Sequence, residues 1–220
     1  MSFDLHIFVP YTKQLLSGIR MTLFLWVVGG LLAMAIGFVV AVLQMVGGRV
    51  VGTIIRAYIE LMRGTPLLAQ LFLLYFGGPA IGLTLDAMTV GLTVLGLYVG
   101  AYFVETFRAG FESIPRGQIE AAASAGIGRW QRLRHIILPQ MLVLILPPVV
   151  NLWIVVLKDT AVLSIITIPE LTFEVTGLTL ETFAFVEPFL LLALVYWGLV
   201  ELTAFLGRKA ELRLGFYLAR

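Results

Sequence analysis

Long runs without a charged residue alternate with short charged segments along this chain. A helix needs about 20 mostly apolar residues to cross the hydrocarbon core of a bilayer. Five runs meet or approach this length, and we expect each to form one spanning helix: Met21–Gly48, Gly64–Leu85, Ala87–Val104, Ile136–Leu157 and Pro188–Val200, the last extending past Glu201 to Gly207. Before them, residues 4–17 mix apolar and polar side chains and predict a short helix on the membrane surface.

The composition agrees with a membrane protein. Hydrophobic residues make up 60% of the 220 residues and charged residues 13%, with a mean hydropathy of +1.01. Soluble domains carry roughly 25% charged residues, and a chain this short cannot bury so much apolar surface in its own core. A transmembrane β-barrel has short strands of alternating polarity, whereas these runs are continuous. We therefore predict an all-α polytopic membrane protein with a single domain over residues 1–220.

Several kinds of chemical site are missing from the sequence. There is no cysteine, which excludes disulfides, thiolate metal sites and cysteine nucleophiles. The two histidines, His6 and His135, are far apart and show no metal-ligand spacing. A phosphate-binding P-loop needs Gly-Lys-Ser or Gly-Lys-Thr, and none of the three lysines follows a glycine. We expect neither a metal ion nor bound ATP in this chain.

The basic residues are distributed unevenly between the two sides of the predicted topology. The segments after the first, third and fifth runs hold twelve of the 15 basic residues: Arg49, Arg56, Arg63, Arg108, Arg116, Arg129, Arg132, Arg134, Arg208, Lys209, Arg213 and Arg220. Because lysine and arginine accumulate in cytoplasmic loops, we predict that the N-terminus lies outside and the C-terminus in the cytoplasm. The segment 112–139 is then cytoplasmic. The segment 159–187 is then external, and it is acidic at Glu170, Glu174, Glu181 and Glu187.

Two of the runs contain prolines in positions that break helices. Arg63-Gly64-Thr65-Pro66 interrupts the start of the second run, and Leu146-Pro147-Pro148 interrupts the fourth. Proline removes a helix hydrogen bond, so we expect the chain to kink or unwind at both sites. Broken helices of transporters often flank the substrate path, because the freed backbone groups need polar partners. A kink that serves packing alone is the alternative.

The segment between the third and fourth runs has the composition of an ordered helical unit. Ser113-Ile114-Pro115 fits a serine N-cap followed by proline in the first turn. The stretch 118–125 is rich in alanine, which favours helix and leaves a thin surface for a partner. Gly126 and Gly128 predict a turn before a second, basic helical turn over 129–134. We interpret the unit as a docking element for a soluble partner; an ordered loop with its arginines at lipid headgroups is the alternative.

The spacing within this segment is more specific than its composition. The order of its residues is Glu120-Ala121-Ala122, then three residues, Gly126, nine residues, Ile136, one residue, and Leu138-Pro139. The pattern resembles the signature loop of binding-protein-dependent ABC importer permeases at all seven fixed positions. Seven matched positions in the expected loop make a strong signal.

Other motifs resemble the polar amino-acid uptake branch of that family, which includes histidine, glutamine and arginine permeases. They are YIELMRGTPLLAQ at 58–70, AYFVETFRAG at 101–110, IPRGQ at 114–118 and LKDT at 157–160. After Lys158-Asp159-Thr160 the branch usually has Ser-Leu, where this chain has Ala161-Val162. The resemblance covers residues 15–215 and implies the five-helix permease fold of such importers.

The resemblance also implies a transport subunit of the bacterial inner membrane and not an enzyme. ATP and Mg²⁺ would be held by a separate dimer of ABC ATPase subunits. That dimer would receive segment 112–139, the coupling loop, and its closure would move the loop as a rigid lever that switches the spans between inward-open and outward-open. The residues that would make the contact are Glu120, Ala121, Ala122 and Gly126.

Other partners are implied by the same resemblance. A periplasmic or lipid-anchored solute-binding protein would dock on segment 159–187, the external loop. A second permease subunit, identical or related, would complete the membrane part. Within the membrane the partners would be an amino-acid substrate and lipid, and no nucleic-acid partner is expected.

Charged residues near the ends of spans are candidates for the substrate path. An amino acid carries an ammonium and a carboxylate, so a membrane site needs partners of both signs or helix ends. Glu105 and Arg108 share a helix face and can form an ion pair or line the inner gate. Lys158 and Asp159 can pair with each other at the outer end of the fourth span or face the path.

Polar residues at the two interrupted spans are further candidates. Arg63 and Thr65 lie at the break of the second span, with Gln70 one turn deeper. Asn151 lies deep in the fourth span and can bind substrate, bond across helices or satisfy backbone freed by Pro147-Pro148. In the third span, the Gly-x-x-x-Gly motif at 96–100 allows close helix crossing, either within one chain or between subunits.

A secondary amino-acid transporter driven by an ion gradient is the alternative function. That class more often has many more spans and an unpaired carboxylate deep in a helix. Here Glu105 and Glu201 lie near the predicted cytoplasmic ends of their spans. The spacing from Glu120 to Pro139 favours the ATP-driven importer.

Overall fold

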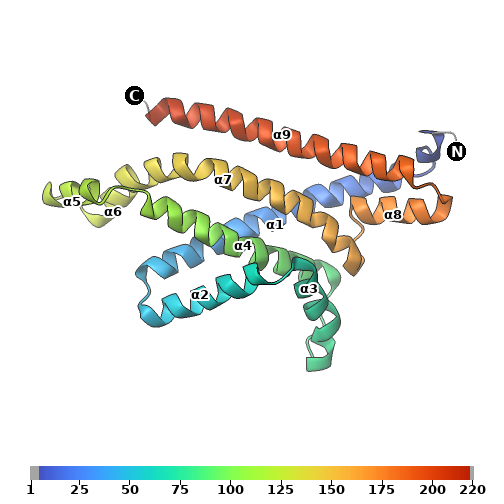
Figure 1. Cartoon of the computed structure of the whole chain (residues 1–220), viewed down its shortest axis with the longest axis horizontal. Coiled ribbons are helices and arrows are strands. Elements are labelled where there is room, and N and C mark those ends of the chain that lie inside the picture. The colour runs from blue at the N-terminus through green and yellow to red at the C-terminus, as the bar shows by residue number, and fades with distance from the viewer. Residues whose placement is uncertain (1–4, 219–220) are drawn as a thin grey trace.

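The computed structural model describes residues 5–218, which form helices joined by short turns (Figure 1). Within this range no residue is in a β-strand, so the all-α prediction is confirmed. The four longest helices are α1 (Thr12–Val46), α4 (Ala87–Glu112), α7 (Leu138–Asp159) and α9 (Val186–Leu218). The shorter helices are α2 (Arg49–Gly64), α3 (Leu67–Phe72), α5 (Arg116–Ser124), α6 (Arg129–Arg132) and α8 (Leu171–Thr182). Short non-α elements are the 3₁₀ helices η1 (Leu5–Phe8), η3 (Gly78–Ile81) and η5 (Thr160–Ile166) and the π-helical elements η2 (Leu73–Gly77) and η4 (Leu133–Ile137).

Helices α1 and α4 form the central pair of the fold. Two glycines of α4 make their close approach possible. A Cβ atom built on Gly96 would lie 2.8 Å from the Leu32 side chain, and one on Gly100 would lie 3.1 Å from Ile36 and 3.4 Å from the Ala33 carbonyl oxygen. The Gly-x-x-x-Gly motif therefore serves packing within one chain.

Helix α7 packs on this pair, and α9 lies along α7 (Figure 1). Trp26 of α1 meets Trp153 of α7 edge to face, with ring centroids 5.8 Å apart. Its indole N–H also donates to the Trp153 carbonyl oxygen at 2.9 Å. On α9 many large apolar side chains, such as Leu194 and Trp197, point outward. Such a surface needs lipid or another apolar partner to cover it.

The helices extend beyond the charge-free runs that predicted them. Helix α1 begins at Thr12, so the prediction of a separate surface helix over 4–17 is wrong for residues 12–17, which belong to the first spanning helix. Only Leu5–Phe8 form a separate turn, and residue 4 lies outside the described residues. Leu15 explains the difference, because it is buried against α8 and not on a membrane surface.

Among the described residues, four helices are long and apolar enough to cross a membrane, or five if a bent pair counts as one span. The chain is therefore a multi-pass membrane protein. The bent pair is α2 with the segment Leu67–Ile81, which meet at 104°. The predicted break at Arg63–Pro66 is confirmed. However, the charge-free runs did not predict the helix over Arg49 to Arg63, because α2 is amphipathic and its polar stripe hid it from such a search.

The fourth span is not broken at its prolines. Helix α7 continues from Leu138 to Asp159 through Pro147 and Pro148, so the chain does not unwind there, and a kink at the prolines stays a prediction. Both prolines lie on the exposed side of the helix. Ile145 and Leu152, on either side of them, are buried in the main core and keep the helix on its course.

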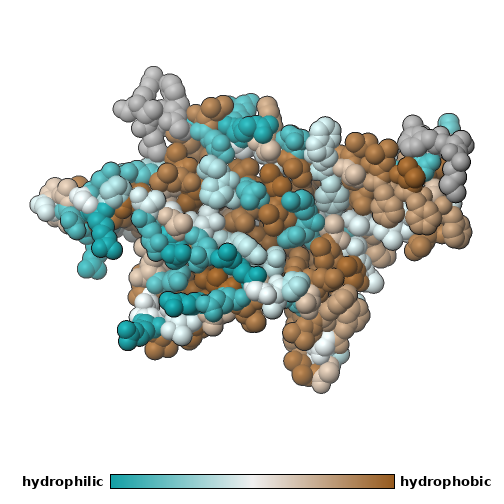
Figure 2. Space-filling model, viewed as in Figure 1, coloured by the Kyte–Doolittle hydropathy of each residue, from teal (hydrophilic) through white to brown (hydrophobic). Residues whose placement is uncertain are grey.

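The two ends of the molecule differ in character. Helix α8 and the N-terminal turn lie at one end, and α5, α6 and the C-terminus lie at the other (Figure 1). Around α8 a second apolar cluster, separate from the main core, joins Leu171, Val175 and Leu178 to Leu15 of α1 and to the start of α9. Hydrophilic side chains gather over α5 and α6 and along one face of α2 (Figure 2). The fold thus places the coupling loop and the external loop at opposite ends.

Candidate functional site

The coupling loop contains two short helices with a tight turn between them. Helix α5 ends in a turn in which the Gly126 N–H donates to the Ala123 carbonyl and the Ile127 N–H to the Ala122 carbonyl, both at 3.0 Å. Gly126 has φ +75°, a left-handed conformation that favours glycine. The predicted glycine turn between two helices is confirmed.

The start of α5 differs from the prediction. Its N-cap is Pro115, and no side chain caps the helix. Ser113 instead ends α4, with its hydroxyl donating back to the Gly110 carbonyl at 2.7 Å. The prediction of a serine cap is wrong because Ser113 lies too far before the first helical residue, Arg116, for its oxygen to reach the free N–H groups there.

Two hydrogen bonds attach α5 to the rest of the chain. The Arg132 guanidinium donates to the Ile119 carbonyl at 3.3 Å, and the Gln140 amide donates to Gln118 Oε1 at 2.8 Å. Ala122 is buried on the inner face of α5. Of the four predicted docking residues, Glu120, Ala121 and Gly126 are exposed. The outer face of α5 is thus open to a partner, while its inner face is fixed to α6 and α7.

The break between α2 and α3 is closed by side chains. The Gln70 amide donates to Thr65 Oγ1 at 2.8 Å, to the Met62 carbonyl at 3.0 Å and to the Thr65 carbonyl at 3.3 Å. The Thr65 hydroxyl donates to the Leu61 carbonyl at 2.8 Å. These bonds satisfy backbone groups that the break leaves free. Thr65 and Gln70 also line an apolar cavity of about 540 Å³ formed by α2, α3, η2, η3 and α4.

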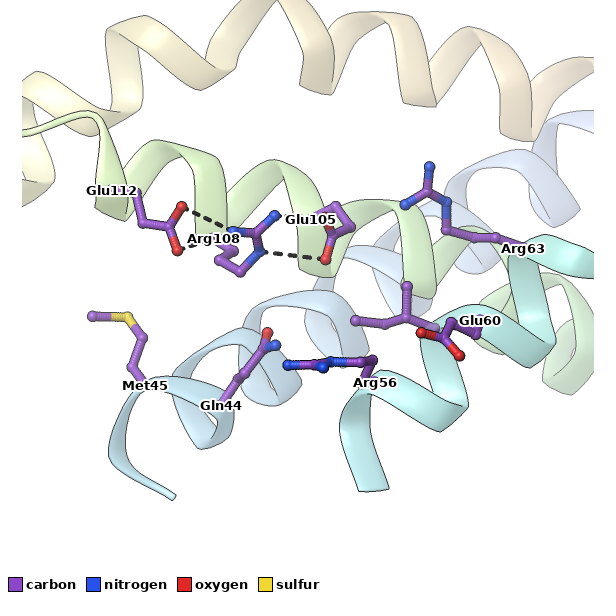
Figure 3. A pocket seen from close by; sticks show the side chains of 9 residues that line it. Gln44, Met45, Arg56, Glu60, Arg63, Glu105, Arg108 and Glu112 are labelled. Carbon is purple, nitrogen blue, oxygen red and sulfur yellow. Dashed lines mark hydrogen bonds and ion pairs between the residues drawn. The ribbon is translucent and has the colours of Figure 1, made fainter. Parts of the chain in front are cut away.

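Three of the predicted path residues meet in a charged cavity of about 590 Å³ between α1, α2 and α4 (Figure 3). Glu105 and Arg108 form an ion pair at 2.7 Å, as one of the two predicted alternatives, and Arg108 also pairs with Glu112 at 2.8 Å. Arg63 enters the cavity from α2. The other residues that line it are Gln44, Met45, Arg56, Ile59 and Glu60. We call this space the charged cavity.

Arg63 of α2 contacts an aromatic side chain of α4. The Arg63 guanidinium lies over the ring of Tyr102, 5.0 Å from its centroid, in the geometry of a cation–π contact. The hydroxyl of Tyr102 is 3.5 Å from that of Tyr98, one turn earlier on α4. Tyr102 and Tyr98 thus continue from Arg63 along α4, the helix that packs against α7.

Lys158 and Asp159 do not pair with each other. The described residues contain no ion pair between them; Lys158 is exposed, and Asp159 Oδ2 is buried without a hydrogen-bond partner. Asn151 is exposed on α7 and makes no hydrogen bond to any described residue. The alternative of a pair between Lys158 and Asp159 is therefore wrong, because Asp159 turns inward while Lys158 faces outward. The alternatives in which Asn151 bonds to another helix of this chain or to freed backbone are also wrong, because Asn151 faces outward.

Several cavity residues were missed from the sequence. Gln44, Arg56, Glu60 and Glu112 line the charged cavity but were not among the candidates. A signal was present in α2, where polar residues recur at three- and four-residue intervals: Arg49, Thr53, Arg56, Glu60 and Arg63. Such spacing places side chains on one face of a helix. Among the described residues, no three His, Cys, Asp or Glu side chains form a group that could hold a metal ion.

A family model described as a binding-protein-dependent transport system inner membrane component matches residues 33–214. The chain belongs to this family. The resemblance inferred from the coupling loop is thus confirmed. A probable amino-acid ABC transporter permease, YckA of Bacillus subtilis (strain 168), is 32% identical over 215 residues, covering 98% of this chain and 95% of YckA. The glutamine transport permease GlnP of Escherichia coli (strain K12) is 31% identical over 216 residues, covering 97% and 99%.

Solved structures of transport components agree with the family. A chain from the crystal structure of an amino acid ABC transporter with histidines has a TM-score of 0.90 and 33% identity, covering 97% of this chain and 100% of that one. An inward-facing structure of the MetNI methionine ABC transporter has a TM-score of 0.76 at 20% identity and shares the fold. The prediction of an importer permease fold is confirmed.

Proposed function

We propose that the chain is the permease subunit of an ATP-driven importer of polar amino acids in a bacterial inner membrane. The names of its relatives support this cargo: glutamine for GlnP of Escherichia coli and arginine for ArtQ of Bacillus subtilis, which is 30% identical over 215 residues. The likeness extends over nearly the full length of both relatives, which supports the role of a permease subunit. The N-terminus lies outside and the C-terminus in the cytoplasm.

The ATPase acts on this chain through the coupling loop. The observation that carries this proposal is the outer face of α5, where Glu120 and Ala121 are exposed while the inner face is tied to α6 and α7. An ATPase subunit that grips this face moves α7 through the bond between Gln118 and Gln140. ATP and Mg²⁺ are bound by that ATPase dimer. A second permease subunit, identical or related, completes the pair, and the solute-binding protein docks at the opposite end, near α8.

The substrate path follows the polar groups inside the fold. The charged cavity offers carboxylates and guanidinium groups together, which suits a cargo with an ammonium and a carboxylate. At the other end, the buried and unpartnered Oδ2 of Asp159 offers an acceptor for an ammonium. Arg63 of the charged cavity lies over Tyr102, whose hydroxyl is 3.5 Å from that of Tyr98. Thr65 and Gln70 support the path by fixing the break that shapes it, whereas Lys158 and Asn151 flank it on the exposed side of α7.

The test is uptake by proteoliposomes that contain the full transporter, with its ATPase and solute-binding protein. We expect Glu120→Lys to lower amino-acid uptake more than tenfold at normal expression while ATP hydrolysis continues uncoupled. Glu211→Lys, the same charge reversal on α9 outside the coupling loop, is the matched control and should transport normally. Full uptake by Glu120→Lys contradicts the coupling role. Uptake by this chain alone under an ion gradient contradicts the ATP-driven importer itself.

A further inference from the structure

Glu170 is a fully buried carboxylate outside the proposed substrate path. It caps the N-terminus of α8 by accepting the Phe173 N–H at 2.8 Å. Its second oxygen accepts the Tyr196 hydroxyl of α9 at 3.1 Å and the Thr22 hydroxyl of α1 at 3.3 Å. Among the described residues it has no ion-pair partner. A buried carboxylate without a counter-ion is costly, and its position therefore calls for an explanation beyond packing.

The hydrogen-bonded chain continues from Glu170 to the end of α7. The Tyr196 hydroxyl lies 3.3 Å from the hydroxyl of Thr160. Thr160 is fully buried, directly follows Asp159, and donates to the Leu157 carbonyl at 2.7 Å. The contacts thus run from Glu170 at the start of α8, through Tyr196 of α9, to Thr160, the residue that follows Asp159.

Counting hydrogens shows which form of Glu170 completes this chain. Tyr196 and Thr160 carry one hydroxyl hydrogen each, and with an ionised Glu170 these go to the carboxylate and to the Leu157 carbonyl. The contact between Tyr196 and Thr160 then has no hydrogen. A protonated Glu170 supplies it: Glu170 donates to Tyr196, Tyr196 to Thr160, and Thr160 to Leu157. A glutamine amide at position 170 can also donate to Tyr196, although its nitrogen cannot accept the Thr22 hydroxyl as the Glu170 oxygen does.

Helix α8 is also fixed at two further points, to α1 and to its N-cap residue Tyr11. The Tyr11 hydroxyl donates to Glu181 Oε2 at 2.8 Å, near the C-terminal end of α8. At its N-terminal end, the Leu171 N–H donates to the Thr22 hydroxyl at 3.1 Å. Because α8 is held at both ends, a force on α8 acts on Glu170 and on the groups bonded to it.

We propose that Glu170 is a positioning residue that acts through Tyr196 on Thr160 and so fixes the turn beside Asp159 at the outer end of α7. This role rests on the proposed function only in assigning Asp159 to the substrate path. We call the hydrogen-bonded series Glu170, Tyr196 and Thr160 the relay. It connects α8, in the segment proposed to face the solute-binding protein, with Asp159, the acceptor proposed for the incoming substrate. It needs no residue of the charged cavity or the coupling loop.

The chain has no cysteine, so single-cysteine reporters give a direct test. Ala161→Cys, next to Thr160, is labelled with a membrane-impermeant maleimide in membrane vesicles that hold the full transporter. We expect Tyr196→Phe or Glu170→Leu to raise the labelling rate at this position at least threefold. Glu170→Gln should keep the rate near that of the parent, because its amide completes the chain.

Two controls separate the relay from general loosening. Tyr75→Phe removes a hydroxyl that makes no hydrogen bond to any described residue, and it should leave the labelling rate unchanged. A second reporter, Ala87→Cys at the start of α4, should label equally in all variants. Unchanged labelling of Ala161→Cys in Tyr196→Phe and Glu170→Leu, or equal increases at both reporters, overturns the relay. Labelling needs no transport, so a wild-type complex that fails to import amino acids refutes the proposed function and leaves this test intact.

Discussion

The side-chain amide of Gln70 donates to the hydroxyl of Thr65 at 2.8 Å across the break between α2 and α3. The same amide reaches two backbone carbonyls, so one side chain holds both ends of a 104° bend. The proline at 66 prevents a continuous helix, and Gln70 determines how the two pieces meet. The bend is therefore a built feature of the fold.

Removing this amide should destabilise the bend. We expect Gln70→Ala to lower the stability of the detergent-solubilised protein by about 1–3 kcal/mol, because partly buried acceptors lose their donor. The measurement is the midpoint of thermal unfolding. Gln14→Ala, which removes an exposed glutamine with no hydrogen bond to any described residue, is the matched control and should leave the midpoint unchanged. Equal midpoints for the two variants contradict a structural role for Gln70.

Gly126 should tolerate asparagine better than valine. Its φ of +75° costs a β-branched residue about 1–2 kcal/mol, whereas asparagine visits this region more readily. A Cβ atom at this position meets no neighbour within 4 Å, so any effect comes from the backbone and not from a clash. Hydrogen exchange of the α5 amides measures it: protection should fall in Gly126→Val and remain in Gly126→Asn. Equal protection in both variants speaks against a required left-handed turn.

The two ion pairs of Arg108 should differ in importance. The Glu112 side chain is 64% exposed, against 30% for Glu105. Exposed pairs contribute about 0–1 kcal/mol, so Glu112→Gln should leave unfolding nearly unchanged and should lower uptake less than Glu105→Gln does. Glu105→Gln removes a carboxylate from inside the charged cavity, and we expect uptake to fall several-fold with little loss of folding stability. The reverse order of effects in uptake assays contradicts a path through this cavity.

Burial raises the pKa of Glu170, which gives folding stability a pH dependence of known sign. In the unfolded chain this carboxyl has a pKa of about 4.3, which is lower than in the folded protein. Its contribution to folding stability is therefore fully present below that pKa and is lost as pH rises through the pKa of the folded protein. The wild type should therefore lose stability relative to Glu170→Gln between acidic and neutral pH. Unfolding midpoints of both proteins across this range measure the difference, and a constant difference contradicts it.

Much of the fold follows from hydrophobic runs, and the exceptions have physical causes. Apolar runs predicted α1, α4, α7 and α9, because spanning segments must satisfy their backbone by helix formation. They missed α2, whose polar stripe faces the charged cavity. The unwinding expected at Pro147 and Pro148 does not occur, because a helix packed on both sides of a proline pair can continue through it.

The candidate site was predictable in one part and not in another. Fixed spacing from Glu120 to Pro139 indicated the family, and the helices and turn of this segment were predictable because they are local in sequence. Contacts between distant residues left no such signal. Glu170 was noted only as part of an acidic loop, and its bonds to Thr22 and Tyr196 arise from tertiary packing.

The length of α1 has a consequence for the membrane around it. A helix of 35 residues is about 52 Å long, whereas the hydrocarbon core of a bilayer is about 30 Å thick. Helix α1 must therefore tilt strongly or project beyond the hydrocarbon. Its polar first turns, with Lys13 and Gln14, favour projection among the headgroups. Helix α8 lies against this same part of α1, so bilayer thickness and headgroup composition would act directly on α8.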